Sequence, residues 1–288
     1  MENTINLTEQ RLADAWAVLQ AHADHADGLQ PDANRLAFAD PEFLLRREMR
    51  GMRMHMELLK PELGQAAAGV NHTIVVFGGA RFCSPEDAQA ASARAQASGN
   101  ASDLAKAQRL VRNAPYYEQA REFGRLVARY SQSCAPEDKL FICTGGGPGV
   151  MEAANRGAAD IGAPSVGLTI ALPKEEKPNP FVPPDLSFRF HYFAIRKMHF
   201  MMRAKALVAF PGGFGTLDEL FEVLCLVQTR KAKPVPIFLY GSDYWKKIIN
   251  FEALADEGAI AHEDLKLFRY VDDPHSVWQE IQAFYGLH

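Results

Sequence analysis

The stretch Pro211–Leu220, PGGFGTLDEL, holds the residue types best suited to chemistry. An apolar run of strand length (206–210) precedes it and an apolar helix-like segment (221–227) follows, so a strand is predicted to end in a glycine turn that opens a helix. Glycines let a bound group approach the backbone closely, and the N–H groups and dipole of a helix start favour an anion. We therefore predict a phosphate site formed by Gly212, Gly213, Gly215 and Thr216.

Glu219 in this stretch has two interpretations. Thr216 and Glu219 are three residues apart, which fits a capping box with threonine as N-cap and glutamate at N3. Alternatively, Glu219 lies beside the bound phosphate compound and takes part in chemistry on it. The neighbouring Asp218 is expected to be a solvated acid of the first helical turn.

Two more strands are predicted to end in glycine turns. The strand 72–77 leads to Gly79 and Arg81, of which Arg81 is a candidate anion contact. The strand 139–143 leads to a cluster that opens a helix at 150–161, and it does not match the G-x-G-x-x-G dinucleotide fingerprint. The candidate binding residues of this cluster are Gly145, Gly146 and Gly147.

Arg196 and Lys197 open a helix that runs into the strand before the central stretch. Only one of two adjacent side chains can face a given pocket, and a basic pair is also typical of a solvated helix end. His191 and His199 are not at the i, i+4 spacing of a helical metal site, and we predict no metal.

Alternating strands and helices with glycine turns predict an α/β fold: a Rossmann-like, doubly wound and mostly parallel sheet. We expect a helical extension over 1–70, with Asp40 capping its second helix, and a catalytic domain over 71–288 with a polar, helical insertion at 84–114. The remaining expected elements are strands at 165–170, 188–193, 235–240 and 267–271, and helices at 7–20, 41–63, 116–130, 242–257 and 274–285.

Composition excludes several classes of protein. Lys plus Arg total 31 against 35 for Asp plus Glu, a net charge of −4, which argues against a general nucleic-acid or anionic membrane surface. The four cysteines lack C-x-x-C spacing and indicate neither a disulfide framework nor a zinc site. The N-terminus lacks the apolar core of a signal peptide and no apolar run is long enough to span a membrane, so we expect a cytoplasmic protein.

The chain resembles the LOG (Lonely Guy) family of cytokinin riboside 5′-monophosphate phosphoribohydrolases and their bacterial relatives, formerly labelled lysine decarboxylases. The resemblance rests on PGGFGTLDE at 211–219, on GGGPGVMEAANRGA at 145–158, and on the Arg196-Lys197 pair placed fifteen residues before Pro211 (211 − 196 = 15). It covers roughly 72–250, and the extension and insertion are those of the longer bacterial subgroup.

The resemblance implies hydrolysis of the N-glycosidic bond of a nucleoside 5′-monophosphate, AMP or a cytokinin riboside monophosphate, to free base and ribose 5-phosphate. It implies that Arg196 and Glu219 are catalytic, that the glycine turns bind phosphate and ribose, and that no cofactor is needed. A homodimer through the helix 217–228 is expected, because apolar residues cover almost its whole circumference. Two alternatives are a non-catalytic carrier of a nucleotide or of molybdenum cofactor, and a pyridoxal-phosphate lysine decarboxylase.

Overall fold

The computed structural model describes residues 36–172 and 177–287; the helix expected at 7–20 lies outside them. By its internal contacts the chain divides into two compact units, Met1–Met56 and Glu57–His288. The domain boundary expected at residue 70 stays a prediction.

The second expected helix is broken into shorter pieces. Asp40 caps it as predicted, because its carboxylate accepts a hydrogen bond from the Phe43 N–H at 3.1 Å. The expectation of one helix over 41–63 is wrong, because the backbone is extended at Arg46 and interrupts it. The pieces are α2 (Pro41–Leu45), η3 (Arg47–Met49) and α3 (Arg50–Ala67), and a separate 3-10 turn, η2 (Ala37–Ala39), precedes them.

Glu57–His288 contains a seven-stranded sheet in the order β4-β3-β2-β1-β5-β6-β7, with every neighbouring pair parallel. The predicted doubly wound α/β fold is confirmed, and the described sheet is wholly parallel. The strands are β1 (His72–Phe77), β2 (Leu140–Thr144), β3 (Val166–Ile170), β4 (Ser187–Phe190), β5 (Ala204–Ala209), β6 (Ile237–Tyr240) and β7 (Arg269–Val271).

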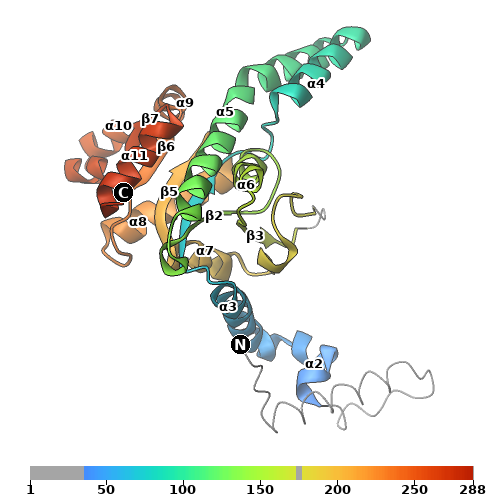
Figure 1. The fold of residues 1–288 in the computed structure, drawn as a ribbon, viewed down its shortest axis with the longest axis vertical. Helices are drawn as coiled ribbons and strands as arrows, with labels where there is room; N and C mark the ends of the chain where they lie inside the picture. Colours follow the sequence, from blue (N-terminus) through green and yellow to red (C-terminus); the bar gives the residue numbers. More distant parts are fainter. Residues whose placement is uncertain (1–35, 173–176, 288) are drawn as a thin grey trace. The chain divides into compact units, whose positions relative to one another are not determined.

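Helices follow most of the strands and cover the sheet (Figure 1). They are α4 (Pro85–Ser98), α5 (Ala101–Gln132), α6 (Val150–Asp160), α7 (Phe193–Met202), α8 (Phe214–Gln228), α9 (Ser242–Ile248), α10 (Phe251–Asp256) and α11 (Pro274–Tyr285). Short 3-10 turns occur at η4 (Pro136–Asp138), η5 (Pro184–Leu186) and η6 (His262–Leu267). The single helix expected at 242–257 is wrong, because Ile249 is extended and Asn250 caps a new helix.

The two faces of the sheet have different covers. Strand residues such as Ile74 pack in one core with side chains of α5, α6 and α11, among them Phe123 and Ile281. On the other face the rings of Phe77 in β1 and Phe200 in α7 meet edge to face, 4.8 Å between centroids. Alternate residues of β1 therefore face opposite layers, as the two-residue period of a strand requires.

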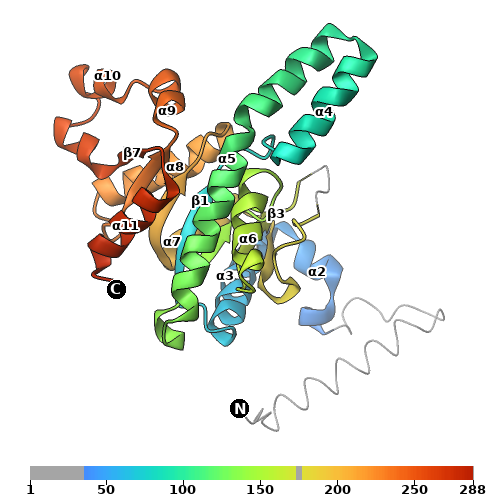
Figure 2. The same ribbon diagram turned by 45° about the horizontal axis from the view of Figure 1, so that its top comes forward.

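The insertion at 84–114 forms α4 and the first half of α5, which lie side by side (Figure 2). The turn expected near residues 98–100 is confirmed: Gly99 has a φ of 65° and ends α4, and Asn100 caps α5. The helix expected at 116–130 is not separate, because α5 continues through Pro115 to Gln132.

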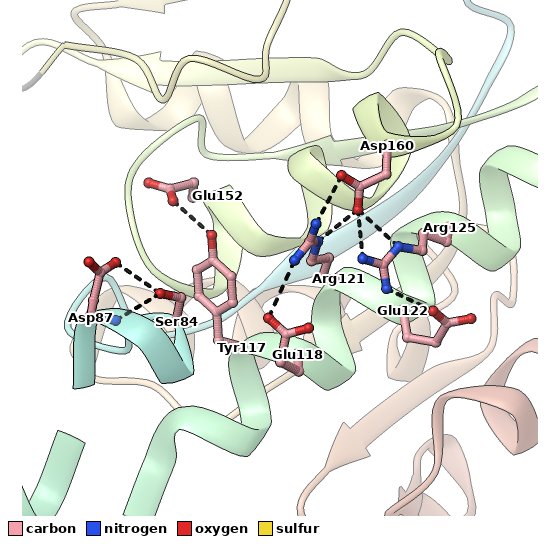
Figure 3. A network of polar contacts seen from close by, with 9 residues as sticks. All are labelled: Ser84, Asp87, Tyr117, Glu118, Arg121, Glu122, Arg125, Glu152 and Asp160. Carbon is pink, nitrogen blue, oxygen red and sulfur yellow. Dashed lines mark hydrogen bonds and ion pairs between the residues drawn. The ribbon is translucent and has the colours of Figure 1, made fainter. Parts of the chain in front are cut away.

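Helices α5 and α6 cross at two glycines and are joined by ion pairs. A Cβ on Gly157 would lie 2.0 Å from the Arg121 carbonyl oxygen, so the close crossing requires glycine there. Arg121 and Arg125 both reach the Asp160 carboxylate, at 2.7 and 2.8 Å, and the Tyr117 hydroxyl donates to Glu152 at the other end of α6 (Figure 3). This network holds α6, and with it the glycine turn that opens α6.

Helix α8 is covered on most sides within its own chain. Leu220, Val223, Leu224 and Val227 are buried, and the ring of the half-exposed Phe221 stacks on Phe251 of α10 at 6.0 Å. The premise that its apolar residues need a second chain is therefore wrong for most of them.

Candidate active site

The candidate site lies where the carboxyl ends of β1 and β5 meet. These neighbouring strands lead to opposite halves of the sheet, and the crevice at such a switch point is where doubly wound sheets bind ligands. A cavity of about 670 Å³ opens there, within the usual size range of small-molecule sites. The turns after β1, β2 and β5 line it, together with α7 and the start of α9.

Gly79 joins the three glycine turns through its backbone. Its N–H donates to the Pro211 carbonyl at 2.9 Å, and its own carbonyl accepts from the Val150 N–H at 3.2 Å. A Cβ on Gly149 would lie 2.3 Å from the Gly79 oxygen, so a side chain there would push the turns apart. The Gly79 N–H is thus used within the protein, although the residue lines the cavity.

Helix α8 begins three residues earlier than a Thr216 N-cap requires. Gly213 is the N-cap, and among the described residues no side chain caps this end of the helix. The capping-box interpretation of Glu219 is therefore wrong; Thr216 lies inside the first turn, Asp218 and Glu219 lie in the second. The N–H groups of Phe214, Gly215 and Thr216 have no helical acceptor and line the cavity, as a phosphate site requires.

Arg196 and Glu219 meet inside this cavity. The Arg196 Nη2 donates to the Glu219 Oε1 at 2.9 Å, and the two side chains are 12% and 6% exposed. The guanidinium also lies over the rings of Phe193 and Phe200, 5.1 and 5.6 Å from their centroids. Among the described residues, the buried Arg196 Nε has no hydrogen-bond partner. A buried donor without a partner is rare and calls for an explanation, and an acceptor on a bound group would supply one.

Burial raises the pKa of Glu219 above its ordinary value, although Arg196 and Lys197 oppose the rise. The dipole of α8 does not offset this rise, because the dipole effect falls off beyond the first turn and Glu219 lies in the second. Glu219 is therefore a more basic carboxylate than a solvated glutamate, which suits a group that accepts a proton.

The other predicted site residues divide into two groups. Those that line the cavity, besides Arg196 and Glu219, are Gly79, Arg81, Gly145, Gly212, Gly213, Gly215 and Thr216. Gly146, Gly147 and Lys197 do not line it. The Gly146 N–H donates to the Thr144 hydroxyl, and the Gly147 carbonyl accepts from Asn179. Lys197 faces away and pairs with Asp218 and Glu222 at 2.9 and 3.0 Å.

Tyr244 is a cavity residue that sequence reasoning missed. Its hydroxyl donates to the Gly212 carbonyl at 2.5 Å, and the indole of the buried Trp245 next to it donates to the Ala209 carbonyl at 3.1 Å. The start of α9 thus fixes the turn after β5. The sequence does show that a glycine, Gly241, follows β6, as glycines follow the strands that end at the cavity. The other missed lining residues carry no polar side chain: Phe77, Gly78, Ala80, Phe82, Met151, Phe200, Phe214 and Leu217.

In residues 36–172 and 177–287 no group of His, Cys, Asp and Glu side chains could hold a metal ion. Among the helices of the same residues, none has the length and apolar character needed to cross a bilayer.

Comparison with known proteins supports the resemblance found in the motifs. Residues 151–281 match the protein family described as "possible lysine decarboxylase". Over an aligned stretch of 132 residues, the chain is 33% identical to the pyrimidine/purine nucleotide 5′-monophosphate nucleosidase of Escherichia coli. That stretch is 39% of this chain and 28% of the relative, so most of the relative's length has no counterpart in the match.

Solved structures of similar shape include two proteins at low identity. The molybdenum cofactor binding protein of Rippkaea orientalis is 18% identical, with 75% of this chain and 98% of that chain covered and a TM-score of 0.45. The molybdenum cofactor carrier protein of Chlamydomonas reinhardtii is also 18% identical, with the same coverage and a TM-score of 0.43.

Proposed function

We propose that this chain, which is similar over part of its length to a nucleotide 5′-monophosphate nucleosidase and resembles the LOG family in its motifs, hydrolyses the N-glycosidic bond of a nucleoside 5′-monophosphate. The observation that carries the proposal is the buried Arg196–Glu219 pair in the cavity that the glycine turns share. The products are the free base and ribose 5-phosphate, and the substrates that we favour are AMP and a cytokinin riboside monophosphate.

The phosphate lies on the first turn of α8 in this proposal. The free N–H groups of that turn, at the positive end of the helix dipole, hold the dianion. Tyr244 keeps the Gly212 carbonyl turned away from the ligand by binding it, and Arg81 at the exposed rim adds a positive charge. Aromatic and methionine side chains of the cavity contact the base and the sugar.

Glu219 acts on the anomeric carbon. As the C1′–N bond breaks, positive charge develops on the ribose, and a nearby carboxylate stabilises it. A water molecule attacks C1′, Glu219 takes its proton, and the bonding electrons leave with the base, which gains a proton from solvent. Arg196 holds the ribose or phosphate through its free Nε and aligns C1′ with Glu219.

A panel of nucleoside 5′-monophosphates tests the proposal, with the matching nucleosides as controls and the released base measured by chromatography. We expect base release from monophosphates and almost none from nucleosides, because the nucleosides lack the phosphate. Nucleotide binding without base release would favour the carrier alternative, and cadaverine from lysine plus pyridoxal phosphate would favour the decarboxylase.

We also propose a homodimer formed by the helices that carry the pair. Exposed apolar side chains occur on α7, at Met198 and Met202, and on the neighbouring α8, at Phe221. Lys197 joins these two helices through Asp218 and Glu222, so the exposed residues belong to one helical layer. Grouped exposed apolar side chains of this kind are typical of an interaction surface.

A further inference from the structure

Helix α7 carries Arg196, and the second half of α3 contacts α7 at both ends and in its middle. From this arrangement we infer that Glu57 is a positioning residue, which sets the place of Arg196 by fixing the start of α7. The inference rests on the proposed function, because it assigns Glu57 an effect on the Arg196–Glu219 pair.

The first contact is at the start of α7. Tyr192 is the N-cap, and its own side chain makes no capping hydrogen bond. Glu57 of α3 instead holds the backbone that leads into the helix: its Oε1 accepts from the His191 N–H at 2.9 Å and its Oε2 from the Tyr192 N–H at 3.0 Å. A carboxylate at this end of a helix also interacts favourably with the helix dipole.

The other contacts are in the middle and at the end of α7. The Leu58 carbonyl pairs with the Nε2 of the buried His199 at 3.0 Å. At the C-cap, Arg203 binds the Glu62 carboxylate with two nitrogens, at 2.6 and 2.8 Å, and its Nε donates to the Val70 carbonyl. Contacts at three levels leave α7 little freedom to slide along α3.

Arg196 lies one turn from the residues that Glu57 binds, and its N–H donates to the Tyr192 carbonyl at 3.2 Å. One hydrogen bond of 2.9 Å, from the Arg196 Nη2 to the Glu219 Oε1, connects the two side chains. Hydrogen bonds weaken steeply with distance and angle, and a misplacement of 1 Å in an active site can cost about a hundredfold in rate. Loosening the first turn of α7 therefore separates Arg196 from Glu219.

The consequence can be measured on Glu219 itself. The charged groups around its carboxylate are Arg196 and Lys197 on α7 and Glu222 on α8. Both positive groups stand on the helix that Glu57 holds, so a loosened α7 removes the charges that oppose the effect of burial. The Glu219 pKa then rises further.

The experiment compares Glu57→Ala and Glu57→Gln with Asn100→Ala. Asn100 is a matched control, because it caps α5 with two hydrogen bonds, to the N–H groups of Ser102 and Asp103, at the tip of the insertion. Two quantities are measured: kcat/KM for AMP, and the pKa of Glu219 by carboxyl carbon NMR, with its signal assigned by its loss in Glu219→Gln.

We expect Glu57→Ala to lower kcat/KM by about tenfold to a hundredfold and to raise the Glu219 pKa. Glu57→Gln retains one acceptor oxygen, so its kcat/KM and its Glu219 pKa should lie between those of the wild type and of Glu57→Ala. If the alanine variant does not fold, the glutamine variant serves as the test. Asn100→Ala lowers the melting temperature and changes neither quantity.

Two results separate this inference from the proposed function. If the wild-type protein releases base and Glu57→Ala lowers only the melting temperature, with Glu219 titrating as before, Glu57 is an ordinary cap and the inference is overturned. If no monophosphate is cleaved but the Glu219 pKa still rises in Glu57→Ala, the positioning stands and the proposed function is wrong.

Discussion

Arg196 and Glu219 are 23 residues apart in the sequence and 2.9 Å apart in the structure. Their meeting places a buried carboxylate and a fixed positive charge at one cavity, beside a helix start without a side-chain cap. A capping glutamate would contribute only about 1 kcal/mol, all of it to stability, whereas a general base contributes about 10² to 10⁴ in rate. The two roles therefore predict opposite results for one substitution.

Glu219→Gln is expected to lose at least about a hundredfold in AMP hydrolysis, because the amide cannot accept the proton of water. Its melting temperature at neutral pH stays equal or rises. Burial raises the folded-state pKa of Glu219, so its stability contribution is fully present below the unfolded-state pKa and lost as pH rises through the folded-state pKa. The neutral amide avoids that loss.

The control is Glu222→Gln, the same change one helical turn away on a side chain that pairs with Lys197 outside the cavity. It should keep most of its activity. A Glu219→Gln enzyme with full activity and a lowered melting temperature would assign Glu219 to structure alone.

The pH dependence of activity follows from the same carboxylate. Glu219 must be ionised to take a proton, so kcat/KM should fall as pH decreases through its raised pKa. A pH series of kcat/KM for AMP should therefore place the acid limb above the ordinary glutamate pKa. An acid limb at or below the ordinary value would mean that another group controls it.

At the scale of elements, three glycine turns have different tasks although they look alike in the sequence. Gly79 joins the turns through its backbone hydrogen bonds. Gly146 and Gly147 form hydrogen bonds with protein groups near their own turn. Gly213 is the N-cap of α8, whose first N–H groups have no acceptor within the helix. The last arrangement offers an anion several such donors.

Two glycines of the turn after β5 should respond differently to alanine. A Cβ on Gly212 would lie 2.1 Å from the Thr216 hydroxyl oxygen, so Gly212→Ala should lower the melting temperature and the activity together. A Cβ on Gly215 meets no atom within 4 Å and lies in the first turn, at the cavity wall. Gly215→Ala should keep the melting temperature and raise the KM for AMP.

Thermal unfolding and steady-state kinetics on both variants check this expectation. An unchanged KM in Gly215→Ala, with phosphate affinity also unchanged, would place the anion elsewhere in the cavity.

The strands, the glycine turns and the doubly wound class of the fold could be predicted, because apolar runs that end in glycine are visible in local sequence. The start of α8 could not, since Thr216 and Glu219 fit a capping box equally well until the backbone places Gly213 as N-cap. The orientation of Lys197 depends on Asp218 and Glu222, which only the fold brings to it. Glu57 and Tyr244 carry no local pattern of their role, because each acts on a residue distant in the sequence.

At the scale of the whole molecule, the layer of α7 and α8 has both the Arg196–Glu219 pair and exposed apolar residues. Most of the apolar side chains of α8 are covered within the chain, so the dimer rests on the few that stay exposed. A dimer through them would place two sites near one interface.

Light scattering at micromolar concentration should give twice the chain mass of 31.9 kDa. The double substitution Met198→Glu and Met202→Glu places charges at half-exposed positions of the proposed interface and should give a monomer. At concentrations too low for the wild-type protein to form a dimer, the two proteins should have the same melting curve. A wild-type monomer at that concentration would contradict the proposed dimer.

The most direct test is a crystal structure of Glu219→Gln with AMP bound. The account predicts the phosphate on the N–H groups of Phe214, Gly215 and Thr216, and the side chain of residue 219 within about 3 to 4 Å of C1′ or of a water placed against it. An AMP bound with its ribose far from residue 219, and with Arg196 turned to solvent, would contradict it.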